Sequence, residues 1–125
     1  AFELRLHFEG VESALNREIK PIIAMGGGSR SDIWCQIIAD VTGKTIQRTS
    51  PAEATALGAG ILAAAGAGLF TSVNQAAIQM GGKIQKSFIP DPTNIQIYSR
   101  IFEDVYRHIF PDLQSRIQKL TAITG

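Results

Sequence analysis

The sequence predicts an α/β fold with a helical tail. Short apolar runs and amphipathic helical patterns alternate over the first half of the 125 residues, whereas helical patterns dominate the second half. A chain of this length is expected to form one domain, 1–125, that buries roughly two thirds of the surface of its unfolded form. Its 45% hydrophobic and 18% charged residues are typical of a folded globular protein rather than a disordered one.

The first segment, residues 2–17, carries two competing patterns. Its apolar side chains begin by alternating as in a strand, but the longer series Leu4, Phe8, Val11 and Leu15 has helical spacing. The longer series favours a helix over this segment.

A strand followed by a helix comes next. The strand is expected over Lys20–Met25, and to be buried, because this stretch is short, apolar and bounded by Pro21 and by glycines. Ser29 and Asp32 have the spacing of a capping box at the start of the helix, and Gly43 ends it. The predicted apolar face of this helix consists of Ile33, Ile37, Ile38 and Val41.

A second strand, 44–49, leads into a helix made of small residues. Ser50 to Glu53 form a second predicted capping box, and the Ala- and Gly-rich helix behind it reaches about Ala67. Its apolar stretch is shorter than the roughly 20 strongly apolar residues that span a bilayer. We therefore expect a tightly packed internal helix, in which a bulky residue at Gly58 would disturb folding.

The second half is predicted to be mainly helical. The expected elements are a short helix from Thr71 or Ser72 to Gly81–Gly82, an extended segment over 83–90 and a strong helical stripe over 95–109. Pro111 is expected to interrupt the stripe, because a proline inside a helix removes a hydrogen bond and clashes with the preceding turn. A shorter helix containing Leu113, Ile117 and Leu120 then follows.

Charge and cysteine content limit the possible functions. The net charge is +1 and the twelve basic residues are scattered, so a nucleic-acid surface is disfavoured. A single cysteine, Cys35, fits a reducing compartment and is expected to be a packed thiol, since no histidine lies near it in sequence. His7 and His108 are isolated, and no Cys/His cluster has zinc spacing. No signal peptide is evident, so we expect a cytoplasmic protein without a membrane anchor.

The stretch IIAMGGGSRSDIW, residues 22–34, carries the strongest functional signal. A strand, a glycine-rich turn and a helix N-terminus together can bind an anion or a nucleotide, because unpaired amides point outward and absent Cβ atoms permit close approach. The alternative is that the glycines only form a tight turn beneath a neighbouring helix. Ser31 stands where the dinucleotide-binding pattern needs glycine, and Gly82-Lys83-Ile84 does not match the P-loop pattern.

These residues resemble the C-terminal portion of the FGGY carbohydrate kinases. The resemblance rests on Gly26-Gly27-Gly28, Ser31, Trp34-Cys35-Gln36, Ala39-Asp40 with Gly43, and Glu53-Ala54-Thr55-Ala56-Leu57-Gly58-Ala59. It covers nearly the whole chain, although residues 82–125 match only in general character. The motifs are specific for the family and say little about the sugar.

The resemblance implies part of the second lobe of an actin-like ATPase with a ribonuclease H-like core. It implies an ATP-dependent kinase that phosphorylates a sugar or polyol hydroxyl, with the adenine nucleotide contacted by Gly26, Gly27, Gly28, Ser29 and Ser31. Some members present an Asn to adenine where this chain has Ser31, whose side chain is shorter. Besides direct contact with adenine, Ser31 could therefore reach it through a water molecule or simply cap its own helix. The resemblance implies that the catalytic base and the Mg²⁺ and phosphate contacts lie in the first lobe and the early part of the second, and that the sugar is bound mostly by the other lobe.

The resemblance therefore predicts a fragment that is inactive alone. A homodimer is possible, and the sequence does not decide whether one forms. Two other functions fit the residues: a non-catalytic nucleotide-binding module of the same fold, and a helical interaction domain in which the glycines only pack. Asp32 and Glu53 are expected to be helix caps, and Asp40 to support the turn at Gly43.

Overall fold

The computed structural model describes residues 1–50 and 54–124. Its elements are α1 (Phe2–Leu15), β1 (Ile22–Ala24), the 3₁₀ turn η1 (Gly27–Arg30), α2 (Asp32–Thr42), β2 (Ile46–Ser50), α3 (Ala54–Gly66), α4 (Val73–Met80), β3 (Lys83–Phe88), α5 (Pro92–Ile101), the π-helical turn η2 (Phe102–Tyr106) and α6 (Arg107–Thr124). The predicted α/β order and the helical tail are both confirmed. The second predicted capping box includes residues 51–53, which lie outside the described residues.

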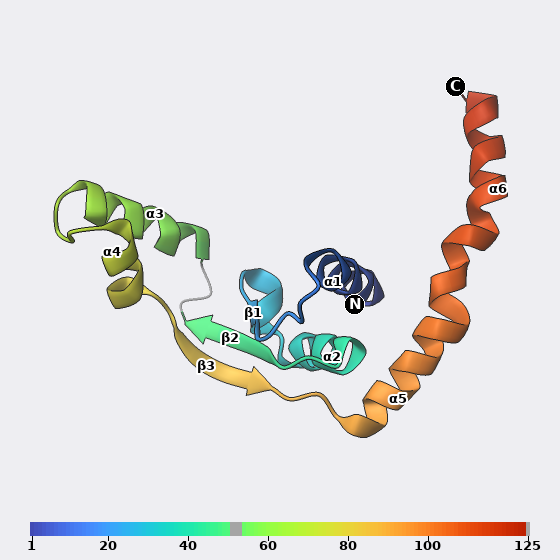
Figure 1. The fold of residues 1–125 in the computed structure, drawn as a ribbon, viewed down its shortest axis with the longest axis horizontal. Helices are drawn as coiled ribbons and strands as arrows, with labels where there is room; N and C mark the ends of the chain where they lie inside the picture. The colour runs from blue at the N-terminus through green and yellow to red at the C-terminus, as the bar shows by residue number, and fades with distance from the viewer. Residues whose placement is uncertain (51–53, 125) are drawn as a thin grey trace.

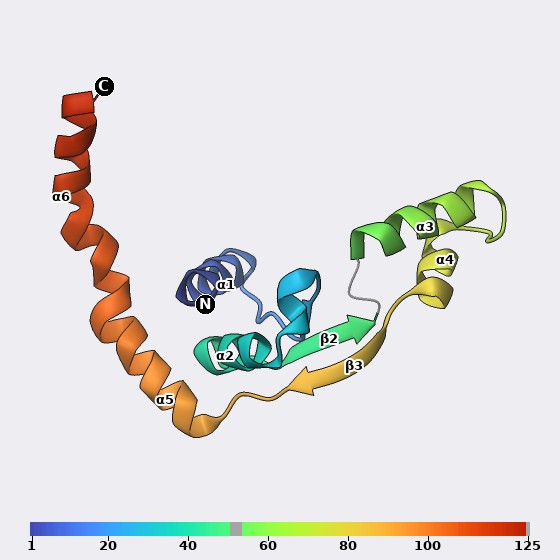
Figure 2. The ribbon, with the colours of Figure 1, turned by 180° about the vertical axis from the view of Figure 1, so that it is seen from behind.

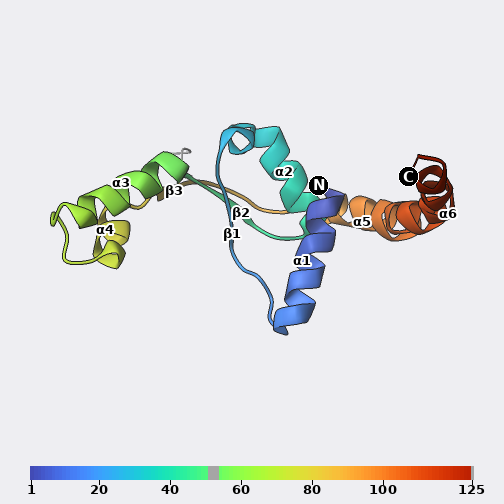
Figure 3. The same cartoon turned by 90° about the horizontal axis from the view of Figure 1, so that it is seen from above.

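The elements form an elongated arrangement with the strands in the middle (Figure 1). The α3–α4 pair lies at one end and the α5–α6 helix leaves from the other, with α1 and α2 beside the strands between them. Seen from above, α2 lies beside the strands, α1 approaches α2 at its N-terminal end and then runs outward, and α6 extends away from the strands (Figure 3).

The sheet has the strand order β1-β2-β3. Strands β1 and β2 are parallel, joined by a crossover through α2, and Ala24 pairs with Arg48. Strand β3 runs antiparallel to β2, as Figure 2 shows, and Arg48 pairs with Lys86. A register shift between Arg48 and Thr49 bends this pair near its end.

The main core lies between α2 and one face of the sheet. It consists of Cys35, Ala39, Ile46 and Phe88, with Ile22, Ala24 and Ile38 packed against them. The prediction of a fully buried first strand is wrong, because side chains alternate along β1 and Ile23 points away from α2 with 50% of its surface exposed. Ile33 is also outside the core, 75% exposed, since the packed face of α2 begins at Cys35.

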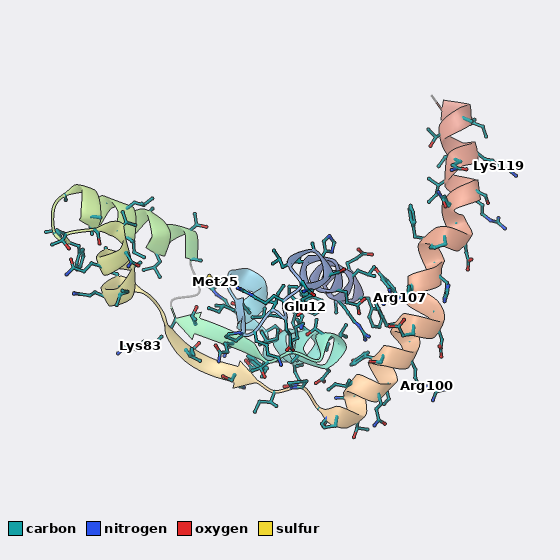
Figure 4. All side chains as sticks on the ribbon, in the orientation of Figure 1. Glu12, Met25, Lys83, Arg100, Arg107 and Lys119 are labelled. Carbon is teal, nitrogen blue, oxygen red and sulfur yellow. The ribbon has the colours of Figure 1, made fainter. Side chains whose placement is uncertain are left out.

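A second cluster joins α1 to the C-terminal helices. Phe102, which is fully buried, has ring neighbours Phe2 and Tyr106 at centroid distances of 5.7 and 6.0 Å. The guanidinium groups of Arg5 and Arg107 lie 4.1 and 4.8 Å from the centre of the Phe102 ring. Figure 4 shows Arg107 between α1 and the C-terminal helices. The first segment is a helix, as predicted, and Phe2 and Arg5 lie on the side of it that packs against the C-terminal helices.

The C-terminal helix continues through Pro111, so the predicted interruption is wrong. Pro111 follows shortly after the π-helical turn η2, where backbone bonds already reach from residue i to i−5. Proline has no amide hydrogen, so the helix continues past Pro111 with one backbone hydrogen bond fewer.

Helix α3 is present as predicted but is not internal. None of its described residues is buried, Leu62 is 60% exposed, and its principal neighbour is α4. A Cβ added at Gly58 would meet no described atom within 4 Å, so the structure gives no packing reason for a glycine there. At Gly60 the nearest atom to such a Cβ is the Cε of Met80, at 3.8 Å. Among the described residues, α3 packs mainly against α4, and much of its surface stays exposed.

Within residues 1–50 and 54–124, no helix is long and apolar enough to cross a membrane. Helix α4 starts where the sequence indicated, since the hydroxyl of Ser72 accepts a hydrogen bond from the amide of Gln75 at 3.1 Å.

Candidate functional site

The glycine loop follows strand β1 at the carboxyl end of the parallel pair. Gly26 has φ of 80° and ψ of −174°, a conformation that side chains strongly disfavour. Gly27 begins the 3₁₀ turn η1, whose amide at Ser29 donates to the carbonyl of Gly26 at 3.1 Å. The chain then enters α2 at Asp32. Five predicted contact residues therefore lie on one continuous turn: Gly26, Gly27, Gly28, Ser29 and Ser31.

The two serines of this turn have different roles from those that the capping-box pattern predicted. Ser31 is the N-cap of α2, since its hydroxyl accepts a hydrogen bond from the amide of Trp34 at 3.2 Å. Ser29 is buried, and its hydroxyl donates to the carbonyl of Gly26 at 2.7 Å. The predicted Ser29–Asp32 capping box is therefore wrong, because the 3₁₀ turn moves the helix start beyond Ser29. The Ser29 hydroxyl shapes the loop from inside.

The space that a side chain would occupy at Gly26 and Gly27 is empty of described atoms. A Cβ added at Gly26 or Gly27 would meet no described heavy atom within 4 Å. At Gly28 the nearest atom is Cδ1 of Trp34, at an ordinary contact distance of 3.6 Å. Packing within the described residues therefore does not require the first two glycines, although the backbone angle requires one at Gly26. This geometry leaves the main chain of the loop open to a flat or charged ligand.

Ion pairs beside the loop were missed by sequence reasoning. Asp32, the first residue of α2, contacts Arg48 of β2 at 2.7 Å and Lys86 of β3 at 2.6 Å. Hydrogen bonds from Lys86 and Arg48 lower the pKa of the Asp32 carboxyl. Asp32 is therefore not the helix cap that the sequence predicted. The ion pairs depend on the register between β2 and β3, which the sequence alone does not reveal.

The carboxylate of Asp40 organises the start of α5 rather than the turn at Gly43. It accepts hydrogen bonds from the amide of Asp91 at 2.8 Å, from Nε2 of Gln36 at 2.8 Å and from Nδ2 of Asn94 at 2.9 Å. Burial raises the pKa of this carboxyl, but these three donors outweigh burial and the net shift is downward. Asp91 caps α5 through the amides of Thr93 and Asn94. These carboxylates have structural tasks.

The remaining reactive residues are placed as structural groups. Cys35 is fully buried, its thiol lies 3.4 Å from the carbonyl oxygen of Ser29, and burial raises the pKa of the thiol. This confirms the packed thiol. His7 and His108 are exposed on α1 and α6. Among the residues that the structure describes, no three His, Cys, Asp or Glu side chains gather as a metal site.

The glycine turn lies between a strand and a helix N-terminus, a geometry that can receive an anionic ligand. The chain superposes on the ligand-bound xylulose kinase from Lactobacillus acidophilus with a TM-score of 0.72 and 23% identity, over 95% of this chain and 24% of that one. This is the actin-like ATPase fold.

Residues 1–67 match the FGGY family of carbohydrate kinases, C-terminal domain. The chain is 30% identical to the xylulose kinase of Bacillus subtilis, over 86% of this chain and 23% of that protein. It is 36% identical over 84 residues to the ribulokinase of Mycolicibacterium smegmatis, which is 67% of this chain and 15% of that protein. The chain belongs to the FGGY family of carbohydrate kinases. It spans about a quarter or less of the length of these relatives.

Proposed function

We propose that this chain is the adenosine-side, C-terminal part of an ATP-dependent sugar kinase. The complete kinase transfers the γ-phosphate of ATP to a hydroxyl of a sugar or polyol. In this proposal Gly26, Gly27 and Gly28 lie against the nucleotide, with the amides of η1 and the Ser31 hydroxyl at its edge. Similarity to xylulose kinase and ribulokinase supports a sugar acceptor but does not choose between sugars.

One observation carries the proposal: the glycine loop is open where a side chain would otherwise stand. Gly26 adopts a backbone conformation reserved for glycine, and no described heavy atom fills the space above Gly26 and Gly27. The adjoining helix N-terminus supplies partial positive charge. Together these features favour a ligand that carries phosphate and lies close to the main chain.

The rest of the chemistry is assigned to the part of the protein outside this chain. Phosphoryl transfer needs a base for the acceptor hydroxyl and a Mg²⁺ ion at the phosphates. Asp32 and Asp40, the two carboxylates of the helix that follows the loop, are engaged by ion pairs and hydrogen bonds. We therefore expect this chain alone to bind nucleotide weakly and to phosphorylate nothing. A buried, reduced Cys35 fits a protein that works in the cytoplasm.

The test uses the full-length kinase that contains this chain. Titration calorimetry with a non-hydrolysable ATP analogue measures nucleotide affinity, and a coupled ADP-release assay over a panel of pentoses, polyols and sugar acids measures transfer. Gly27→Val should weaken analogue binding about tenfold or more, because the side chain occupies the ligand's position at a cost above about 1.4 kcal/mol. Gly10→Val is the matched control, since a Cβ at Gly10 on α1 also meets no described atom.

Three outcomes are distinguishable. Binding and transfer by the wild type, both reduced by Gly27→Val alone, support the kinase. Binding without transfer to any acceptor would indicate the non-catalytic module instead. Unaltered binding of the ATP analogue by a folded Gly27→Val variant would contradict the proposal that the nucleotide lies against the glycine loop.

A further inference from the structure

Arg48 joins the glycine loop to the neighbouring strand. It lies on β2, paired with Ala24 of β1, two residues before Gly26. Its Nη1 donates to the carbonyl of Ser29 at 3.0 Å and lies 3.4 Å from the carbonyl of Arg30. The same nitrogen lies 2.7 Å from Oδ1 of Asp32, and the side chain is only 15% exposed. One guanidinium therefore holds the end of η1 and the start of α2.

Asp32, which also pairs with Lys86, holds Arg48 from the other side. Arg48 and Lys86 are directly opposite on β2 and β3, an arrangement in which two like charges repel. Asp32 lies between them and contacts both, through Oδ1 to Arg48 and through Oδ2 to Lys86. Both cations also lie near the ring of buried Phe88, at 5.6 Å from its centre for Arg48 and 5.0 Å for Lys86. The carboxylate thus ties the N-terminus of α2 to two strands.

Ser29 connects this ion cluster to the first glycine. Its carbonyl accepts from Arg48, while its amide and its hydroxyl both donate to the carbonyl of Gly26, at 3.1 and 2.7 Å. The printed hydrogen bonds of the Arg48 guanidinium are all made by Nη1, to the carbonyls of the turn and to Asp32, while Nε is buried without a hydrogen-bond partner among the described residues. Displacing Arg48 therefore displaces the turn that defines the backbone angles of Gly26.

We propose that Arg48 is a positioning residue for the nucleotide loop, held in place by Asp32 and Lys86. The inference rests on the proposed function, because the loop is its object. Arginine suits this task, since its planar group reaches several acceptors at once, whereas the ammonium of lysine is a single point charge on a flexible stem. The residue does not touch the ligand in this proposal. It determines where the loop amides lie when the ligand arrives.

The experiment compares KM for ATP and KM for the sugar in the full-length kinase, using the best acceptor from the panel. Arg48→Met should raise KM for ATP about tenfold and leave KM for the sugar within about twofold, because only the nucleotide side loses its support. Arg48→Lys should raise KM for ATP about threefold, since it keeps the charge opposite Asp32 and loses contacts to the turn. Arg100→Met, the same change at an exposed arginine of α5 (Figure 4), should change neither constant.

The outcomes separate this inference from the proposed function. An active wild type whose KM for ATP is unaltered in both Arg48 variants overturns the positioning role and leaves the kinase intact. An equal rise in both KM values also overturns it, because a general loss of structure would do the same. Should Arg48→Met fail to fold, Arg48→Lys decides alone. A wild type that binds no nucleotide removes both proposals.

Discussion

Replacing Asp40 by alanine should release the start of α5 from α2. The carboxylate is 3% exposed and accepts three hydrogen bonds, one of them from the backbone amide of Asp91. The side-chain amides of Gln36 and Asn94 are half-buried and can hydrogen-bond to water instead. The backbone amide of Asp91 would lose its hydrogen bond to the carboxylate. A hydrogen bond to a charged group contributes about 1.5–3 kcal/mol, and these contributions are not additive. We expect local stability to fall by about 3 kcal/mol in total.

Amide hydrogen exchange in the full protein, read by mass spectrometry, measures this loss locally. Peptides that cover residues 88–96 should exchange roughly 100-fold faster in Asp40→Ala, because about 1.4 kcal/mol corresponds to a factor of ten. Asp104→Ala, at an exposed carboxylate of η2, should leave these peptides unchanged. Equal exchange in wild type and Asp40→Ala would refute the assignment of Asp40 as the anchor of α5.

The other predictions concern pH, the helix cap and the aromatic cluster. The pKa of Asp40 is lowered in the folded state. The stability that its carboxylate contributes is therefore fully present above the ordinary carboxyl pKa of about 4 and is lost as pH falls through the lowered value. Amide exchange at residues 88–96, corrected for intrinsic rates, should show this pH-dependent step in wild type and not in Asp40→Ala. Ser31→Ala removes the N-cap of α2 and should destabilise the helix by about 1 kcal/mol, measured as faster exchange of its first turn, whereas an unchanged first turn would contradict the cap. Phe102→Ala should lower the free energy of unfolding by about 3–5 kcal/mol in denaturant titration, because the ring is fully buried. Phe110→Ala, at a ring that is 67% exposed, should cost far less, and equal costs would contradict the cluster.

Local signals in the sequence predicted local features well. The helical spacing over the first segment, Gly43 as a helix end and Ser72 as a helix start are all confirmed, because each depends on neighbours within a few residues. The position of the glycine loop between a strand and a helix is confirmed for the same reason. Its role as a nucleotide contact stays a prediction.

Features that depend on strand pairing or on irregular helical turns were missed or wrong. Arg48 and Lys86 meet Asp32 only because β2 and β3 pair in one register. The spacing predicted Ser29 as the cap, with capping by Ser31 as an alternative to ligand contact, and the 3₁₀ turn makes Ser31 the cap. Pro111 was expected to interrupt a helix, but α6 continues through it after a π turn that no simple periodicity reveals.

The most direct test of the central claim is a crystal structure of the full-length kinase with a non-hydrolysable ATP analogue. We predict that the adenosine part of the analogue lies within van der Waals distance of the main chain at Gly26 and Gly27, with Arg48 still bound to the carbonyl of Ser29. An analogue bound elsewhere, or a loop covered by the protein's own side chains, would contradict the account.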